Sequence, residues 1–128
     1  DDFDNDDANA DSLGSWTVID EIGDGACMLR CVSRYIYGSP ITHRYVRTQI
    51  LHHISSNLHV QYPMFGGLTF FNIIDTGVNS ELIQIAGRAE QLYSSVPEYL
   101  KLMSHPTAYC TNLELRAASQ LYNREFRI

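Results

Sequence analysis

Residues 20–38 read DEIGDGACMLRCVSRYIYG, and this stretch contains the pattern that decides the fold. From Cys27 onward, apolar residues recur at three- and four-residue steps until Gly38, which predicts an amphipathic helix between these two residues. Gly23 and Gly25 come directly before it and predict a tight turn. The cysteine is therefore expected at the first position of a core helix, immediately after a glycine turn.

A cysteine in this place has two interpretations. Backbone N–H groups and the helix dipole favour a thiolate at a helix start, so Cys27 could be a nucleophile, and the same N–H groups could hold the oxyanion of an acyl-transfer intermediate. Gly25 would let the backbone come close, and Asp24 would brace the turn or orient an imidazole. The alternative is a small packed residue, because free cysteine is among the most buried residue types.

The rest of the chain predicts more helices and little sheet. A helix over 39–57 has Ser39 as its cap, and capping patterns also begin helices at Ser95 and Thr111, each with Glu three residues later. Residues 58–77 are expected to form a loop with a short strand, and residues 124–128 a strand. A helix is expected over 79–95, with one apolar face made of Leu82, Ile85, Ala86, Ala89 and Leu92. These elements predict an α+β fold, with helices packed on a small β-sheet.

Composition indicates one globular domain without nucleic-acid or membrane partners. Of 128 residues, 45% are apolar and 19% charged. Residues 1–11 contain six of the 15 acidic residues and no basic one, so the remaining nine acids balance the nine bases, and no basic patch is expected. No apolar run is long enough for a membrane span, and no leader pattern is present. We expect an acidic flexible tail over 1–14 and the domain over 15–128.

Three cysteines, Cys27, Cys31 and Cys110, have no zinc-site spacing and an odd number, so no metal, cofactor or disulfide framework is expected. Reduced thiols indicate a reducing compartment, the cytoplasm, or the host cytoplasm if the source is a virus. The sequence starts with Asp rather than Met and stops at REFRI, so we expect a piece of a longer polypeptide.

Residues 23–30, GDGACMLR, resemble the active-site signature of the ovarian-tumour (OTU) family of cysteine peptidases, whose nucleophilic Cys opens the first core helix. Residues 98–128, EYLKLMSHPTAYCTNLELRAASQLYNREFRI, resemble a later part of the same family. The resemblance implies a papain-like fold class and a deubiquitinase, in which Cys27 attacks the bond between ubiquitin, or a ubiquitin-like protein, and a lysine. Asp24 matches the family residue that helps form the oxyanion site, with the N–H groups of Ala26 and Cys27 as donors.

The sequence also departs from the family pattern. The family's general-base His lies on a strand that would follow Ile128, so weak or absent activity is expected, and no role is carried over to His43, His52, His53, His59 or His105. Ala26 replaces a common Asn, and Tyr109-Cys110-Thr111 replaces Trp-Gly-Gly. Two alternatives stay open: a non-catalytic structural or protein-binding module within a larger, for example viral, polypeptide, and a plain helical interaction domain.

Overall fold

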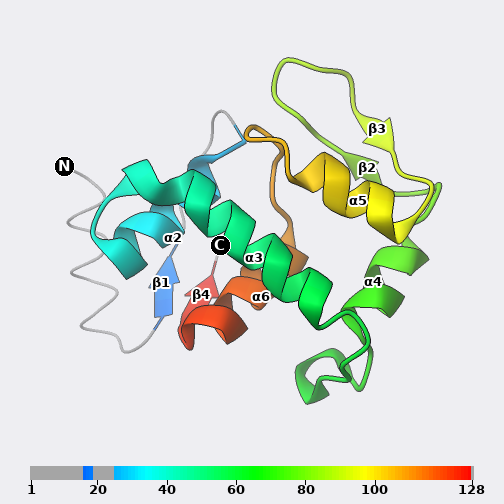
Figure 1. Ribbon diagram of the computed structural model, residues 1–128, viewed down its shortest axis with the longest axis horizontal. Helices are drawn as coiled ribbons and strands as arrows, with labels where there is room; N and C mark the ends of the chain where they lie inside the picture. Colours follow the sequence, from blue (N-terminus) through cyan, green and yellow to red (C-terminus); the bar gives the residue numbers. More distant parts are fainter. Residues whose placement is uncertain (1–15, 19–24, 128) are drawn as a thin grey trace.

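The computed structural model describes residues 16–18 and 25–127. Asp24 and the predicted acidic tail lie outside the described residues. In chain order the elements are β1 (Trp16–Val18), α2 (Cys27–Tyr37), the 3-10 turn η1 (Pro40–Thr42), α3 (His43–Ser56), the 3-10 turn η2 (Pro63–Phe65), α4 (Phe70–Thr76), β2 (Leu82–Ile83), β3 (Gln91–Leu92), α5 (Val96–Met103), α6 (Asn112–Tyr122) and β4 (Glu125–Arg127). Figure 1 shows the helices with two small sheets, one beside α2 and α6 and the other at the edge of the molecule beside α5. This arrangement confirms the α+β prediction.

Helix α2 is the predicted helix of the opening stretch. It begins at Cys27, and Gly38 ends it in the left-handed conformation with φ 77°, where its N–H donates to the carbonyl of Arg34. Its buried face includes Leu29 and Val32, both fully enclosed. The helix is thus a core element whose first residue is the candidate nucleophile.

Helix α3 crosses the middle of the molecule in Figure 1, with α2, β1 and β4 on one side and α4, α5 and β2–β3 on the other. Val46, Ile50 and Ile54 form its buried stripe, as predicted. The expected start is wrong by one turn: Ser39 caps the 3-10 turn η1, and the α-helix begins only at His43. Arg47 is buried on the same helix, which the sequence pattern did not indicate.

The loop expected over 58–77 is confirmed up to Thr69, where only the 3-10 turn η2 interrupts it, but the short strand is wrong, because helix α4 follows. Thr69 caps the helix: its hydroxyl accepts from the N–H of Asn72, and the Asn72 side chain accepts from the N–H of Thr69. Phe70 and Ile74 are buried in the core. The reciprocal cap and the two buried side chains explain why a Gly- and aromatic-rich segment is helical here.

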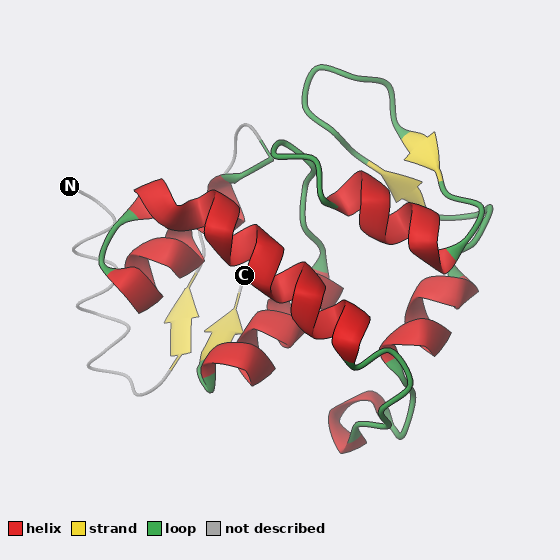
Figure 2. Ribbon diagram, in the orientation of Figure 1, coloured by secondary structure: helices red, strands yellow, loops and turns green. Residues whose placement is uncertain are grey.

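The helix expected over 79–95 is also wrong, because this segment forms the β2–β3 hairpin, which Figure 2 shows apart from the other two strands. Leu82 pairs with Leu92 across the antiparallel strands, and both side chains are about half exposed. Ile83, Ile85 and Tyr93 enter the core, and the two isoleucines are two positions apart. Alternate burial is typical of a strand, and it overrides the helical spacing of the apolar residues.

The C-terminal part confirms three predictions. Ser95 caps α5, the capping box of Thr111 and Glu114 begins α6, and a strand, β4, follows. Strand β4 pairs in parallel with β1, with Thr17 opposite Phe126. None of the helices in the described ranges combines the length and apolarity of a membrane span.

Candidate active site

The thiol of Cys27 lies at the first position of α2, on a core element and next to a turn. Ala26 is the N-cap residue and its side chain makes no cap hydrogen bond, while the N–H of Arg30 donates to the Ala26 carbonyl at 2.9 Å. No acidic side chain occupies the first turn. Cys27 is 8% exposed and Ala26 2% exposed. Cys27 therefore lies at a helix N-terminus, the kind of position at which backbone dipoles favour an anion.

Gly25 is required by its conformation and by its neighbours. Its φ is +83°, and a Cβ on this residue would lie 2.0 Å from the carbonyl oxygen of Thr107 and 3.2 Å from Cδ1 of Tyr109. No side chain larger than hydrogen fits at such a distance from backbone. The turn before Cys27 is thus in direct contact with residues 107–109, far away in sequence.

Residues 107–109 are held on their other side by the segment that follows β2. The N–H of Ala86 donates to the Thr107 carbonyl at 3.1 Å, and the N–H of Tyr109 donates to the Gln84 carbonyl at 2.8 Å. Ile85 and Ala108 form the isolated antiparallel bridge between them. Gly25 therefore packs on a backbone that the hairpin segment also supports.

Arg47, on helix α3, connects the turn before Cys27 to the same loop. Its guanidinium donates to the carbonyl oxygens of Met103 and Ala108, both at 2.8 Å, of Pro106 at 3.2 Å and of Gly25 at 3.4 Å. Burial lowers the Arg47 pKa, and negative charge on the Cys110 thiol or the Glu114 carboxyl acts in the opposite direction and raises it. An arginine on a helix is ordinarily exposed, so sequence reasoning missed this residue; its position next to Val46 on the apolar stripe was the available signal.

Cys110 is close to the candidate nucleophile but is held as a neutral thiol. Burial, then the negative charge of Glu114, raise the pKa of Cys110 well above its ordinary value, and the charge of Cys27 acts in the same direction. Nη1 of Arg47 is 3.9 Å from its sulfur. The prediction that Cys110 is a packed thiol agrees with this environment, and Cys31, 5% exposed, lines the core as expected.

Glu114 is a buried carboxyl at the start of α6. Its Oε1 accepts from the N–H and the hydroxyl of Thr111 at 2.7 and 2.8 Å, and its Oε2 accepts from the hydroxyl of Tyr99. Burial raises the Glu114 pKa, although these hydrogen bonds oppose the shift. Thr111 therefore serves as a helix cap at the place where the resemblance expects glycine.

A comparison with protein-family models matches residues 22–128 to the OTU-like cysteine protease family. The chain belongs to this family. Searches of curated proteins and of solved structures found no significant match. Family membership agrees with the resemblance of the two stretches that contain Cys27 and Glu114, and with the α+β fold.

The histidines of this OTU-like domain have varied surroundings. His105 accepts at Nδ1 from the N–H of Thr107, at 3.2 Å, so a neutral ring carries its proton on Nε2. His53 bonds Gln120 through Nε2 at 3.0 Å, and His59 stacks against Phe71 with 5.0 Å between ring centroids. These contacts place three of the five histidines in structural roles.

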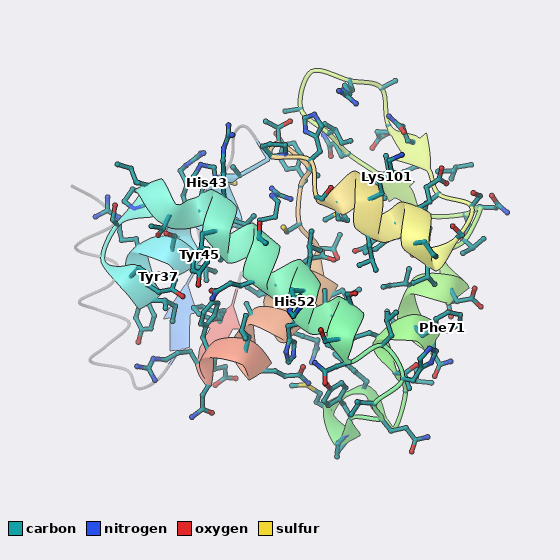
Figure 3. All side chains as sticks on the ribbon, in the orientation of Figure 1. Tyr37, His43, Tyr45, His52, Phe71 and Lys101 are labelled. Atoms are coloured by element: carbon teal, nitrogen blue, oxygen red, sulfur yellow. The ribbon has the colours of Figure 1, made fainter. Side chains whose placement is uncertain are left out.

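The two remaining histidines lie on α3, and Figure 3 shows His43 at its start and His52 further along the helix. His43 is one turn before Arg47, so the two share a face of α3. His52 is exposed. Among the described residues, no group of three or more His, Cys, Asp or Glu side chains is gathered as a metal ion would require.

A pocket of about 540 Å³ opens beside the loop that contacts Gly25. It lies between the β2–β3 hairpin and the helices α5 and α6, and its lining includes Glu81, Glu90, Tyr99, Tyr109 and Cys110. Sequence reasoning could not locate this pocket, because it predicted a helix where the hairpin lies. The hairpin thus supplies one wall of a hollow next to the candidate site.

Proposed function

We propose that this OTU-like domain is a deubiquitinase whose nucleophile is Cys27. The single observation that carries the proposal is the position of Cys27 at the start of α2, directly after a glycine turn that packs on backbone, within a chain of the OTU-like cysteine protease family. The substrate is the amide between the C-terminal glycine of ubiquitin, or a ubiquitin-like protein, and a lysine.

The reaction follows from the chemistry of a thiol. The Cys27 thiolate attacks the carbonyl carbon, and the carbonyl electron pair moves to oxygen, which accepts hydrogen bonds from the N–H groups of Ala26 and Cys27. The intermediate collapses as the C–N bond breaks, and the lysine amine leaves with the proton that a general base took from the thiol. Water then hydrolyses the thioester and releases the ubiquitin carboxylate. Asp24, by its family match, supports the oxyanion site.

We propose slow turnover for this chain. The support is that the contacts described for His53, His59 and His105 are with Gln120, Phe71 and Thr107 rather than with the Cys27 thiol. Positioned proton transfer is worth about 10²- to 10⁴-fold in rate.

We also propose a reducing compartment such as the cytoplasm, and the support is that the three described cysteines form no disulfide.

The test is reaction with a ubiquitin that carries a C-terminal electrophile, read as a mass increase of the intact protein. We expect one adduct on the unaltered chain, none on Cys27→Ala, and an unchanged adduct on the matched control Cys110→Ala. Turnover on a fluorogenic ubiquitin amide should be slow even where labelling is complete. No adduct in a folded sample would contradict the proposal and favour a non-catalytic module, whose ubiquitin binding is then measured by NMR titration.

A further inference from the structure

Arg47 is 4% exposed, and its guanidinium donates to backbone carbonyls of two separate segments. Met103, Pro106 and Ala108 contribute three acceptors from the end of α5 and the loop after it, and Gly25 contributes one from the turn before Cys27. A charge in such a place is costly unless hydrogen bonds satisfy it. A cation that satisfies carbonyls on both sides holds the two segments at a fixed distance.

The hydrogen bond to Gly25 has a consequence for the next residue. The carbonyl of Gly25 and the N–H of Ala26 belong to one peptide group, which is planar and trans, so the two point in opposite directions. When Arg47 fixes the direction of the oxygen, it also fixes the direction of the Ala26 N–H. This N–H is one of the two donors assigned to the oxyanion in the proposed function.

We propose that Arg47 is a positioning residue that orients the Gly25–Ala26 peptide as an oxyanion-binding donor. The inference rests on the proposed function of Cys27 and adds to it a residue on α3 that does not contact the substrate. Lysine cannot replace it, because one ammonium group does not reach carbonyls on both segments as the planar guanidinium does.

The simpler interpretation is that Arg47 only stabilises the fold. Both roles predict a lower free energy of unfolding for Arg47→Met, so stability alone does not separate them. The positioning role predicts, in addition, a selective loss of oxyanion stabilisation in protein that is still folded. A thiol that attacks an aldehyde forms a hemithioacetal whose oxygen, once the C–S bond has formed and the thiol proton has moved to it, occupies the oxyanion site. A thiol that displaces bromide from an alkyl bromide creates no such oxygen.

The experiment compares two ubiquitins, one ending in an aldehyde and one in a bromoethyl amide, on the unaltered chain, Arg47→Lys and Arg47→Met. The control is Arg44→Met, an exposed arginine on the same helix. Below the unfolding temperature of every variant, we expect both Arg47 variants to bind the aldehyde at least about tenfold more weakly, since losing one oxyanion donor costs about 10²- to 10³-fold in rate. Their reaction with the bromide should stay within about threefold. Equal losses with both reagents, or none, would overturn the proposal.

If the unaltered chain reacts with neither reagent, the proposed function fails, and the orientation of the peptide is tested on its own. The ¹³C resonance of the Gly25 carbonyl and the ¹⁵N resonance of Ala26 should both shift in Arg47→Lys and stay in place in Arg44→Met. Unchanged resonances in Arg47→Lys would show that Arg47 does not determine the orientation of the Gly25–Ala26 peptide group.

Discussion

The carbonyl oxygen of Thr107 occupies the space in which a side chain of Gly25 would stand, 2.0 Å from the position of its Cβ. The loop before α6 therefore contacts the turn before Cys27 through its backbone, and Gly25 contributes only a hydrogen atom to this contact. This contact is the basis of the first prediction.

Gly25→Ala should lower the free energy of unfolding by much more than Gly87→Ala. Both glycines have a positive φ, which costs an L-residue about 1–2 kcal/mol, but the space around Gly87 is open. Gly87→Ala should therefore lose about 1 kcal/mol, while Gly25→Ala must also displace the Thr107 backbone. Urea unfolding of the two variants measures the difference. Equal losses would mean that the turn moves away from Thr107 without cost.

The three thiols should react with iodoacetamide in a defined order. Cys27 at the helix start should react first. Cys31, 5% exposed in the core, and Cys110, whose pKa is raised by burial and by Glu114, should both stay unreacted at neutral pH, with Cys110 reacting only in alkaline solution. Peptide mass spectrometry after timed alkylation at several pH values gives the order. The Cys27→Ala variant is the control, since it should show no labelling at neutral pH. Labelling of Cys110 before Cys27 would contradict the assignment of the nucleophile.

Stability should depend on pH through Glu114. Its pKa is raised above the ordinary 4.5, so the folded state binds more protons than the unfolded state between 4.5 and the raised value. The contribution is fully present below pH 4.5 and is lost as pH rises through that window. Glu114→Gln has no carboxyl to titrate, so its stability relative to the unaltered chain should improve as pH rises. Urea unfolding at pH 4 to 7 measures this difference, and a constant difference would contradict the raised pKa.

The β2–β3 hairpin can be tested through its alternating side chains. Ile85 is 1% exposed and Leu82 is 54% exposed, although a helix over 79–95 would place both on one face. Ile85→Ala should cost about 2–5 kcal/mol, and Leu82→Ala less than about 0.5 kcal/mol. Thermal or urea unfolding decides between the two arrangements, because similar losses at both positions would favour the helix.

The sequence predicted those helices whose caps and apolar spacing, read from neighbouring residues, match the face that each helix buries. Helix α2 has an apolar period and a glycine stop, and α5 and α6 have side-chain caps, so each was recognised from residues close together in the chain. The hairpin was missed because the spacing of its apolar residues imitates a helix, and the burial of Ile85 depends on Ala108, which is distant in sequence.

The candidate site was predictable only in part for the same reason. Cys27 follows from its position after the glycines and before a helical period. Arg47 acts through carbonyl oxygens, and every residue has one, so no residue type in the sequence marks its partners. Asp24 lies outside the described residues, and its role stays a prediction.

The parallel pairing of β1 with β4 places Thr17 beside Phe126, which closes a loop over most of the chain. A contact of such sequence separation has a large closure entropy and slows folding compared with the local helices. During synthesis, β1 leaves the ribosome before β4 does, so we expect it to lack this partner until β4 has been made. We therefore expect the helices to fold first and this strand pair last, which would leave β1 open to mispairing with other chains in the meantime.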